Sequence, residues 1–144
     1  MIESRSKRPK RLWIAAIMNV ILGLLSISFL VFLATTARVP EELRITGGMT
    51  AFAAATAGFM VISSVMALLG KPSWRQLMLS AALIYYGSIL AQNFNFLVSG
   101  SETLVPAQKL ASNAVRSGLE IAINLWALLS TKTRDYFRSI PSAP

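Results

Sequence analysis

Three long stretches of the chain carry no charged residue, and they are its clearest pattern. They cover residues 12–37, 45–70 and 76–101. Each is longer than the roughly 20 apolar residues with which a helix crosses a bilayer, whereas helices buried in soluble proteins are usually shorter. The pattern predicts membrane-spanning helices at about residues 12–36, 49–69 and 74–98.

A fourth apolar segment, residues 110–131, differs from the other three because it contains charge. One helical face would carry four polar residues at spacings of four, three and four: Asn113, Ser117, Glu120 and Asn124. Glu120 would lie roughly 15 Å deep, near the centre of a hydrocarbon core of about 30 Å, where a lipid-facing carboxylate costs several kcal/mol. We therefore predict a fourth span at about residues 110–131. Its polar face is turned toward the other helices, and Arg116 lies within reach of Glu120 at i,i+4.

The predicted fold is therefore all-α, an integral membrane four-helix bundle in a single domain. Residues 1–11 form a basic cytoplasmic N-terminal segment, residues 12–131 the four-span transmembrane domain and residues 132–144 a basic cytoplasmic tail. Within the tail, Tyr136, Phe137 and Ile140 are spaced to lay a short amphipathic turn on the membrane surface.

The basic residues predict how the chain is oriented. With four spans, ten Lys and Arg residues lie on the side of the two termini and four on the other side. The positive-inside rule then places both termini in the cytoplasm. Trp13, Trp74 and Trp126 fall near the same interface, where indole rings prefer to lie. The net charge of +8 is thus explained by topology, and no nucleic-acid partner is expected.

Polar and small residues inside the spans are the candidate functional positions. The polar or ion-binding candidates are Glu120, Asn124, Ser117, Arg116, Asn19, Tyr85, Ser88 and Gln92. Two interpretations of Glu120 remain open: a structural carboxyl, protonated or paired with Arg116, and a carboxylate that binds a proton or cation. Helix packing is expected at the small-residue positions Ala51, Ala54, Ala55 and Gly58, which places the second span at the centre of the bundle or at a self-association face.

Counting depth at about 1.5 Å per residue predicts which polar residues meet. Asn19 and Asn124 share a level roughly 10 Å from the cytoplasmic side, so we expect a hydrogen bond between the first and fourth spans. Glu120 should lie level with Gly23 and with residues 85–88.

The sequence excludes several classes of activity. It contains no Cys and no His, and it shows no nucleotide-binding or metalloprotease motif. No enzyme activity, cofactor or metal is expected. The sequence favours an accessory, assembly or immunity-type protein that binds the lipid bilayer and another membrane protein or a second copy of itself. The alternative is a small proton- or cation-coupled transporter or channel subunit that uses Glu120. A bacterial inner membrane is the expected location.

Overall fold

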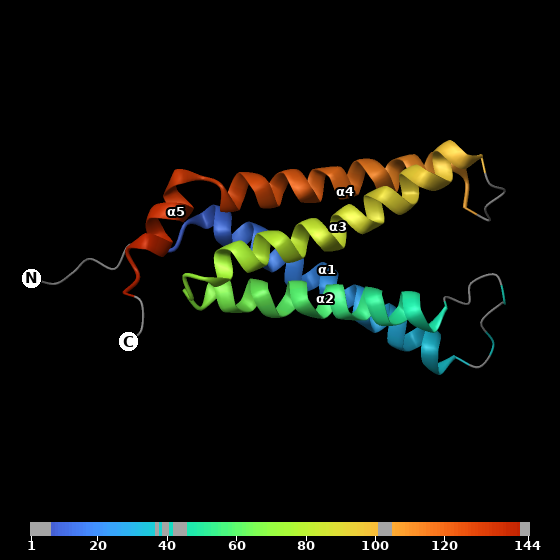
Figure 1. Ribbon diagram of the computed structural model, residues 1–144, viewed down its shortest axis with the longest axis horizontal. Coiled ribbons are helices and arrows are strands. Elements are labelled where there is room, and N and C mark those ends of the chain that lie inside the picture. Colours follow the sequence, from blue (N-terminus) through green and yellow to red (C-terminus); the bar gives the residue numbers. More distant parts are fainter. Residues whose placement is uncertain (1–6, 37, 39–40, 42–45, 101–104, 142–144) are drawn as a thin grey trace, which may run out of the picture.

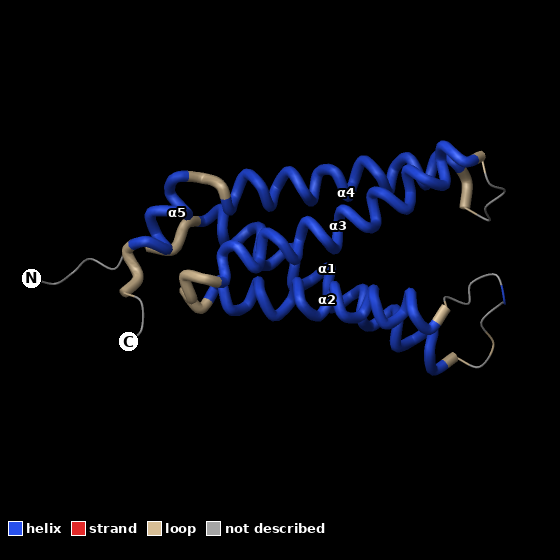
Figure 2. The backbone as a smooth tube through the Cα atoms, in the orientation of Figure 1, coloured by secondary structure: helices blue, strands red, loops and turns tan. Residues whose placement is uncertain are grey.

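The computed structural model describes residues 7–36, 38, 41, 46–100 and 105–141, and the chain in these ranges is helical without strands. Its helices are α1 (Lys10–Thr35), α2 (Gly47–Leu68), α3 (Trp74–Ser99), α4 (Ala107–Leu128) and α5 (Thr131–Arg138), shown in Figures 1 and 2. Three of them, α1, α2 and α3, are long and apolar enough to cross a membrane. The predicted all-α fold class is thereby confirmed, and the three long apolar helices support the predicted membrane protein.

The helix ends follow local backbone signals. α1 and α4 each begin directly after a proline in an extended conformation, Pro9 and Pro106. α2 and α3 are followed by Gly70 and Gly100, whose φ values of 82° and 58° place them in the left-handed region that ends helices. The bounds differ from the predicted spans by at most three residues.

The helices are arranged as two pairs. α1 packs along α2 and α3 packs along α4, with a further interface between α2 and α3 and only a short one between α1 and α4. In Figure 1 the α1–α2 pair and the α3–α4 pair lie together at the end of the bundle that carries α5 and separate toward the other end. The bundle is therefore closed at one end and splayed at the other.

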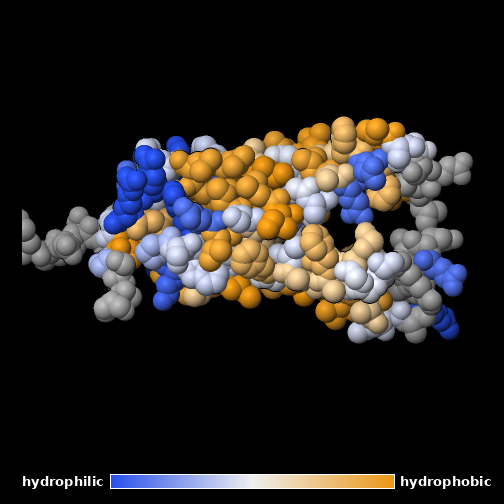
Figure 3. All heavy atoms as spheres, in the orientation of Figure 1, coloured by the Kyte–Doolittle hydropathy of each residue, from blue (hydrophilic) through white to orange (hydrophobic). Residues whose placement is uncertain are grey.

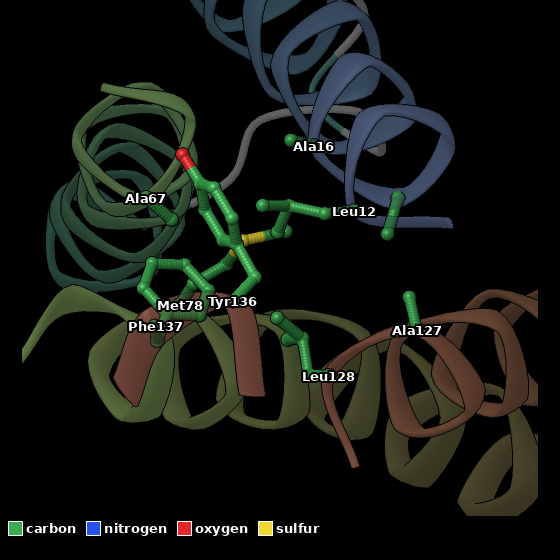
Figure 4. Close-up of a cluster of buried hydrophobic side chains, with 9 residues drawn as sticks. Leu12, Ala16, Ala67, Met78, Ala127, Leu128, Tyr136 and Phe137 are labelled. Carbon is green, nitrogen blue, oxygen red and sulfur yellow. The ribbon is translucent and has the colours of Figure 1, made fainter. Parts of the chain in front are cut away.

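The C-terminal segment corrects one prediction. Tyr136 and Phe137 do not lie on an outer surface: they are only 6% and 5% exposed and pack into the closed end of the bundle. Figure 4 shows this cluster, whose members are Leu12, Ala15, Ala16, Ala67, Met78, Ala127, Leu128, Tyr136 and Phe137. We call it the end cluster.

The reason for the correction lies in the turn between α4 and α5. The predicted fourth helix continues to residue 131, but α4 ends at Leu128, and Ser130 caps α5 by accepting a hydrogen bond from the Thr133 backbone N–H. The turn folds α5 back over the bundle. Arg75 closes the same end, because its Nη1 atom donates to the Leu128 carbonyl at 3.2 Å.

Candidate functional site

The predicted asparagine pair is present. Asn19 of α1 donates from Nδ2 to Oδ1 of Asn124 of α4 at 2.8 Å, and Asn124 donates from Nδ2 to Oδ1 of Asn19 at 3.1 Å. Both side chains are 0% exposed. Depth counting from the sequence thus identified a reciprocal, fully buried amide pair that joins the first and fourth helices of the bundle.

The other two long helices also bond to this pair. Tyr86 of α3 donates its hydroxyl hydrogen to Oδ1 of Asn19 at 3.0 Å, and Asn19 Nδ2 donates to Oγ of Ser64 of α2 at 3.3 Å. We call Asn19, Ser64, Tyr86 and Asn124 the polar centre. All four long helices meet there, and no buried side-chain nitrogen or oxygen in the described part of the chain lacks a hydrogen-bond partner.

Tyr86 and Ser64 were not among the predicted site residues. The polar face predicted for the third span runs through Tyr85 and Ser88, next to Tyr86 but not including it. A signal was available for Tyr86, because the hydroxyl of a tyrosine in the middle of a span must find a partner. No comparable signal distinguishes Ser64 from Ser63, since helical serines also bond to their own backbone, as Ser63 does to the Met60 carbonyl.

One turn of α4 away from the polar centre lies an ion pair. Arg116 Nε donates to Glu120 Oε1 at 2.9 Å, as the i,i+4 spacing predicts. The Glu120 side chain is only 10% exposed and faces the bundle, whereas the Arg116 side chain is 64% exposed. Glu120 therefore faces inward, as predicted, and its partner Arg116 remains largely exposed.

This ion pair lies in a cleft of about 360 Å³ between α1, α3 and α4. α4 contributes Asn113, Arg116, Ser117 and Glu120. The lining residues from the other two helices are Leu22, Leu25, Ser26, Tyr85, Tyr86 and Ile89. Figure 3 shows the surface hollowed between the two helix pairs, toward the splayed end. Glu120 of α4, Leu22 of α1 and Tyr85 of α3 thus line the same cleft.

Two predicted polar residues lie outside the cleft. Ser88 donates to the carbonyl of Tyr85 in its own helix at 2.8 Å, and Gln92 is exposed. Neither contributes to the lining, whereas Tyr85 and Ser117 do. The polar face predicted for the third span is therefore only partly turned toward α4.

The predicted packing stripe of the second span faces outward. Ala51, Ala54 and Ala55 are exposed, and a methyl group added at Gly58 would meet no atom within 4 Å. The residues of α2 that enter the bundle are Ala57, Met60, Ser63, Ser64 and Ala67. The sequence predicts that these small residues lie either at the centre of the bundle or at a self-association face. Their exposure contradicts the first placement, and the second stays a prediction.

The cleft offers one carboxylate, one guanidinium and several hydroxyl and amide groups against apolar walls. Such a set can form charge-assisted hydrogen bonds to a polar or charged group. In the described residues, no group of three or more Asp, Glu, His or Cys side chains is placed to hold a metal. Comparisons with protein-family models, with curated proteins and with solved structures find no match to this chain.

Proposed function

We propose that this chain is a non-enzymatic membrane interaction protein: an accessory subunit, assembly factor or immunity-type protein that binds another membrane protein. The observation that carries the proposal is the closed polar centre. Its other three side chains all hydrogen-bond to Asn19, and the end cluster fills the adjoining end of the bundle. The central polar groups of this bundle thus hold its helices together. A bundle of this kind is suited to act as a scaffold.

The outer surface supports binding of a partner within the membrane. Large apolar side chains cover it, as Figure 3 shows, and the outward face of α2 adds the small residues Ala51, Ala54, Ala55 and Gly58. Small residues let helix backbones approach closely in lipid, where packing rather than the hydrophobic effect drives association. The outward face of α2 is therefore the part of the surface that we assign to the partner.

The proposal is tested by enlarging one residue of this face. Ala55→Leu should reduce the amount of co-purifying partner in mild detergent about tenfold, which corresponds to about 1.4 kcal/mol of lost packing. The matched control is Ala122→Leu, at an alanine of α4 that is also exposed. Equal recovery of the partner with both variants would remove α2 as the interface, and recovery of no stoichiometric partner with the unaltered chain would remove the proposal.

The proposal includes the topology. We infer that α4 also crosses the membrane and that both termini lie in the cytoplasm, in a bacterial inner membrane. Support comes from the exposed side of α4, which carries Val115, Leu119 and Trp126, and from Arg11, whose guanidinium carbon lies 4.6 Å from the centre of the Trp126 ring. A stacked Arg–Trp pair is typical of a headgroup boundary.

Single cysteines test this topology without background labelling, because the chain contains no native cysteine. In intact cells, a membrane-impermeant maleimide should label Val105→Cys, in the α3–α4 connection. Ser73→Cys, in the α2–α3 turn, and Ser139→Cys, after α5, should react only after lysis. Labelling of Ser139→Cys together with Val105→Cys in intact cells would show that α4 does not cross the membrane.

A second candidate function, a proton- or cation-coupled transporter, is favoured by one observation. The single buried carboxylate of the described spans, Glu120, faces a cleft rather than packed side chains. If transport is the function, Glu120→Gln should abolish proton-coupled flux in proteoliposomes while the protein stays folded, because the amide keeps the shape but loses the titratable proton. A scaffold should be nearly indifferent to the same substitution.

A further inference from the structure

The Arg116–Glu120 ion pair in the cleft uses only part of the hydrogen-bonding capacity of its two side chains. Arg116 uses Nε and Glu120 uses Oε1. Within the described residues, the two terminal nitrogens of Arg116 and the Oε2 atom of Glu120 have no hydrogen-bond partner. Both side chains line the cleft, and that of Glu120 is only 10% exposed. The cleft therefore presents a free cationic edge and a free anionic edge side by side.

Neither a simple anion nor a simple cation suits such a pair. An anion that approaches Arg116 is repelled by Glu120, and a cation that approaches Glu120 is repelled by Arg116. A ligand that carries both charges satisfies both edges, and each charge-assisted hydrogen bond is shorter and stronger than a neutral one. The arrangement is complementary to a zwitterion.

The remaining walls of the cleft indicate that the ligand also has an apolar part. Leu22, Leu25 and Ile89 are apolar, and Leu25 is 61% exposed, so the cleft is continuous with the outer surface of α1. The volume of about 360 Å³ is at the lower end of the range for small-molecule sites. It accommodates a headgroup and the start of a chain, while the rest of a chain extends along the apolar outside.

We infer that this cleft binds an amphiphile with a primary ammonium and a phosphate, in which Arg116 holds the phosphate and Glu120 holds the ammonium. A primary ammonium donates hydrogen bonds to a carboxylate, whereas a trimethylated one does not. The ligand class is therefore the phosphoethanolamine group, which a bilayer phospholipid or a soluble phosphoamine can supply. This inference is independent of the proposed function.

The test uses the full chain in mild detergent and native mass spectrometry. The protein is mixed with equal amounts of short-chain phosphatidylethanolamine, phosphatidylglycerol or phosphatidylcholine, and the bound fraction of each is measured. We expect phosphatidylethanolamine to bind about tenfold more tightly than the other two, the difference that one charge-assisted hydrogen bond supplies. Equal binding of phosphatidylethanolamine and phosphatidylglycerol by the unaltered protein would overturn the inference without the need for any variant.

Variants then assign the two charges. Glu120→Gln should lower phosphatidylethanolamine binding to the level of phosphatidylglycerol, and Arg116→Gln should weaken both lipids. The matched control is Lys109→Gln, an exposed cation of α4 outside the cleft, which should change neither. Unchanged lipid selectivity in a folded Glu120→Gln protein would contradict the assignment.

Two further arms complete the test. Ser26→Phe fills the cleft but replaces neither residue of the ion pair. It should abolish selective binding, so it covers the case in which the charge variants do not fold. Retained selectivity in Ser26→Phe would place the lipid elsewhere and overturn the inference. Free phosphoethanolamine distinguishes the sources: competition at lipid-like concentrations supports a soluble ligand, and competition only at far higher concentrations supports the bilayer lipid.

Discussion

Replacing Asn19 with leucine is expected to lower the free energy of unfolding by about 2–4 kcal/mol, since it removes four hydrogen bonds that each contribute about 0.6 kcal/mol on average in a membrane bundle and up to about 1.7. The substitution also leaves the Tyr86 hydroxyl and the Asn124 Oδ1 atom without their partner in the centre of the bundle, while Asn124 Nδ2 keeps its bond to the Glu120 carbonyl. Unsatisfied polar groups in an apolar interior add to the loss. The measurement is reversible unfolding in detergent micelles or bicelles.

A double-mutant cycle separates the pair from the two single sites. Because Asn19 and Asn124 bond reciprocally, the double substitution to leucine should cost less than the sum of the two single ones. The control is Asn93→Leu, since Asn93 Nδ2 donates only to the Ile89 carbonyl of its own helix at 2.8 Å. It should cost less than about 0.5 kcal/mol. If Asn19→Leu and Asn93→Leu cost the same, the polar centre does not hold the bundle together.

Gly23→Ala is expected to destabilise the protein by about 1–3 kcal/mol, the usual cost of overpacking. A methyl group at Gly23 would lie 2.5 Å from Cγ2 of Val61 and 3.3 Å from the carbonyl oxygen of Ala57. A valine in a helix has essentially one preferred rotamer, and a backbone oxygen cannot move alone, so α1 and α2 must separate. Thermal or denaturant unfolding of the detergent-solubilised protein measures the effect.

Two further variants show whether the loss of stability comes from this contact between α1 and α2. Gly58→Ala, where the added methyl group meets no atom within 4 Å, should be neutral or slightly stabilising, because alanine favours the helix. Val61→Ala combined with Gly23→Ala should recover part of the lost stability by removing the clashing Cγ2 atom. Equal stabilities of Gly23→Ala and Gly58→Ala would mean that α1 and α2 do not approach closely at this level.

The sequence predicted the polar core of the bundle well, because the rise of a helix converts residue number into depth. Counting placed Asn19 level with Asn124, and the cost of a carboxylate in lipid turned Glu120 inward; both appear in the structure. The three long apolar helices were also predictable, from the length of the three stretches that carry no charged residue. These predictions succeed because each depends on a single physical quantity.

Other features depend on tertiary packing that periodicity does not encode. α2 has small residues on several faces, so its composition does not say which face enters the bundle, and Ala57 rather than Ala51 or Ala55 is buried. The aromatic pair Tyr136 and Phe137 suits either a membrane surface or the end of a bundle. The turn at Ser130 decides between them, since it directs α5 back onto the end cluster. Predicting that direction requires the positions of the surrounding helices.

The measurement that most directly tests the proposal of an interaction protein is the mass of the particle purified intact in mild detergent, with its protein components identified. The account predicts one stoichiometric complex that contains this chain and a second, different membrane polypeptide. A particle whose mass is only a whole-number multiple of the chain itself would contradict the account and turn attention to transport through Glu120.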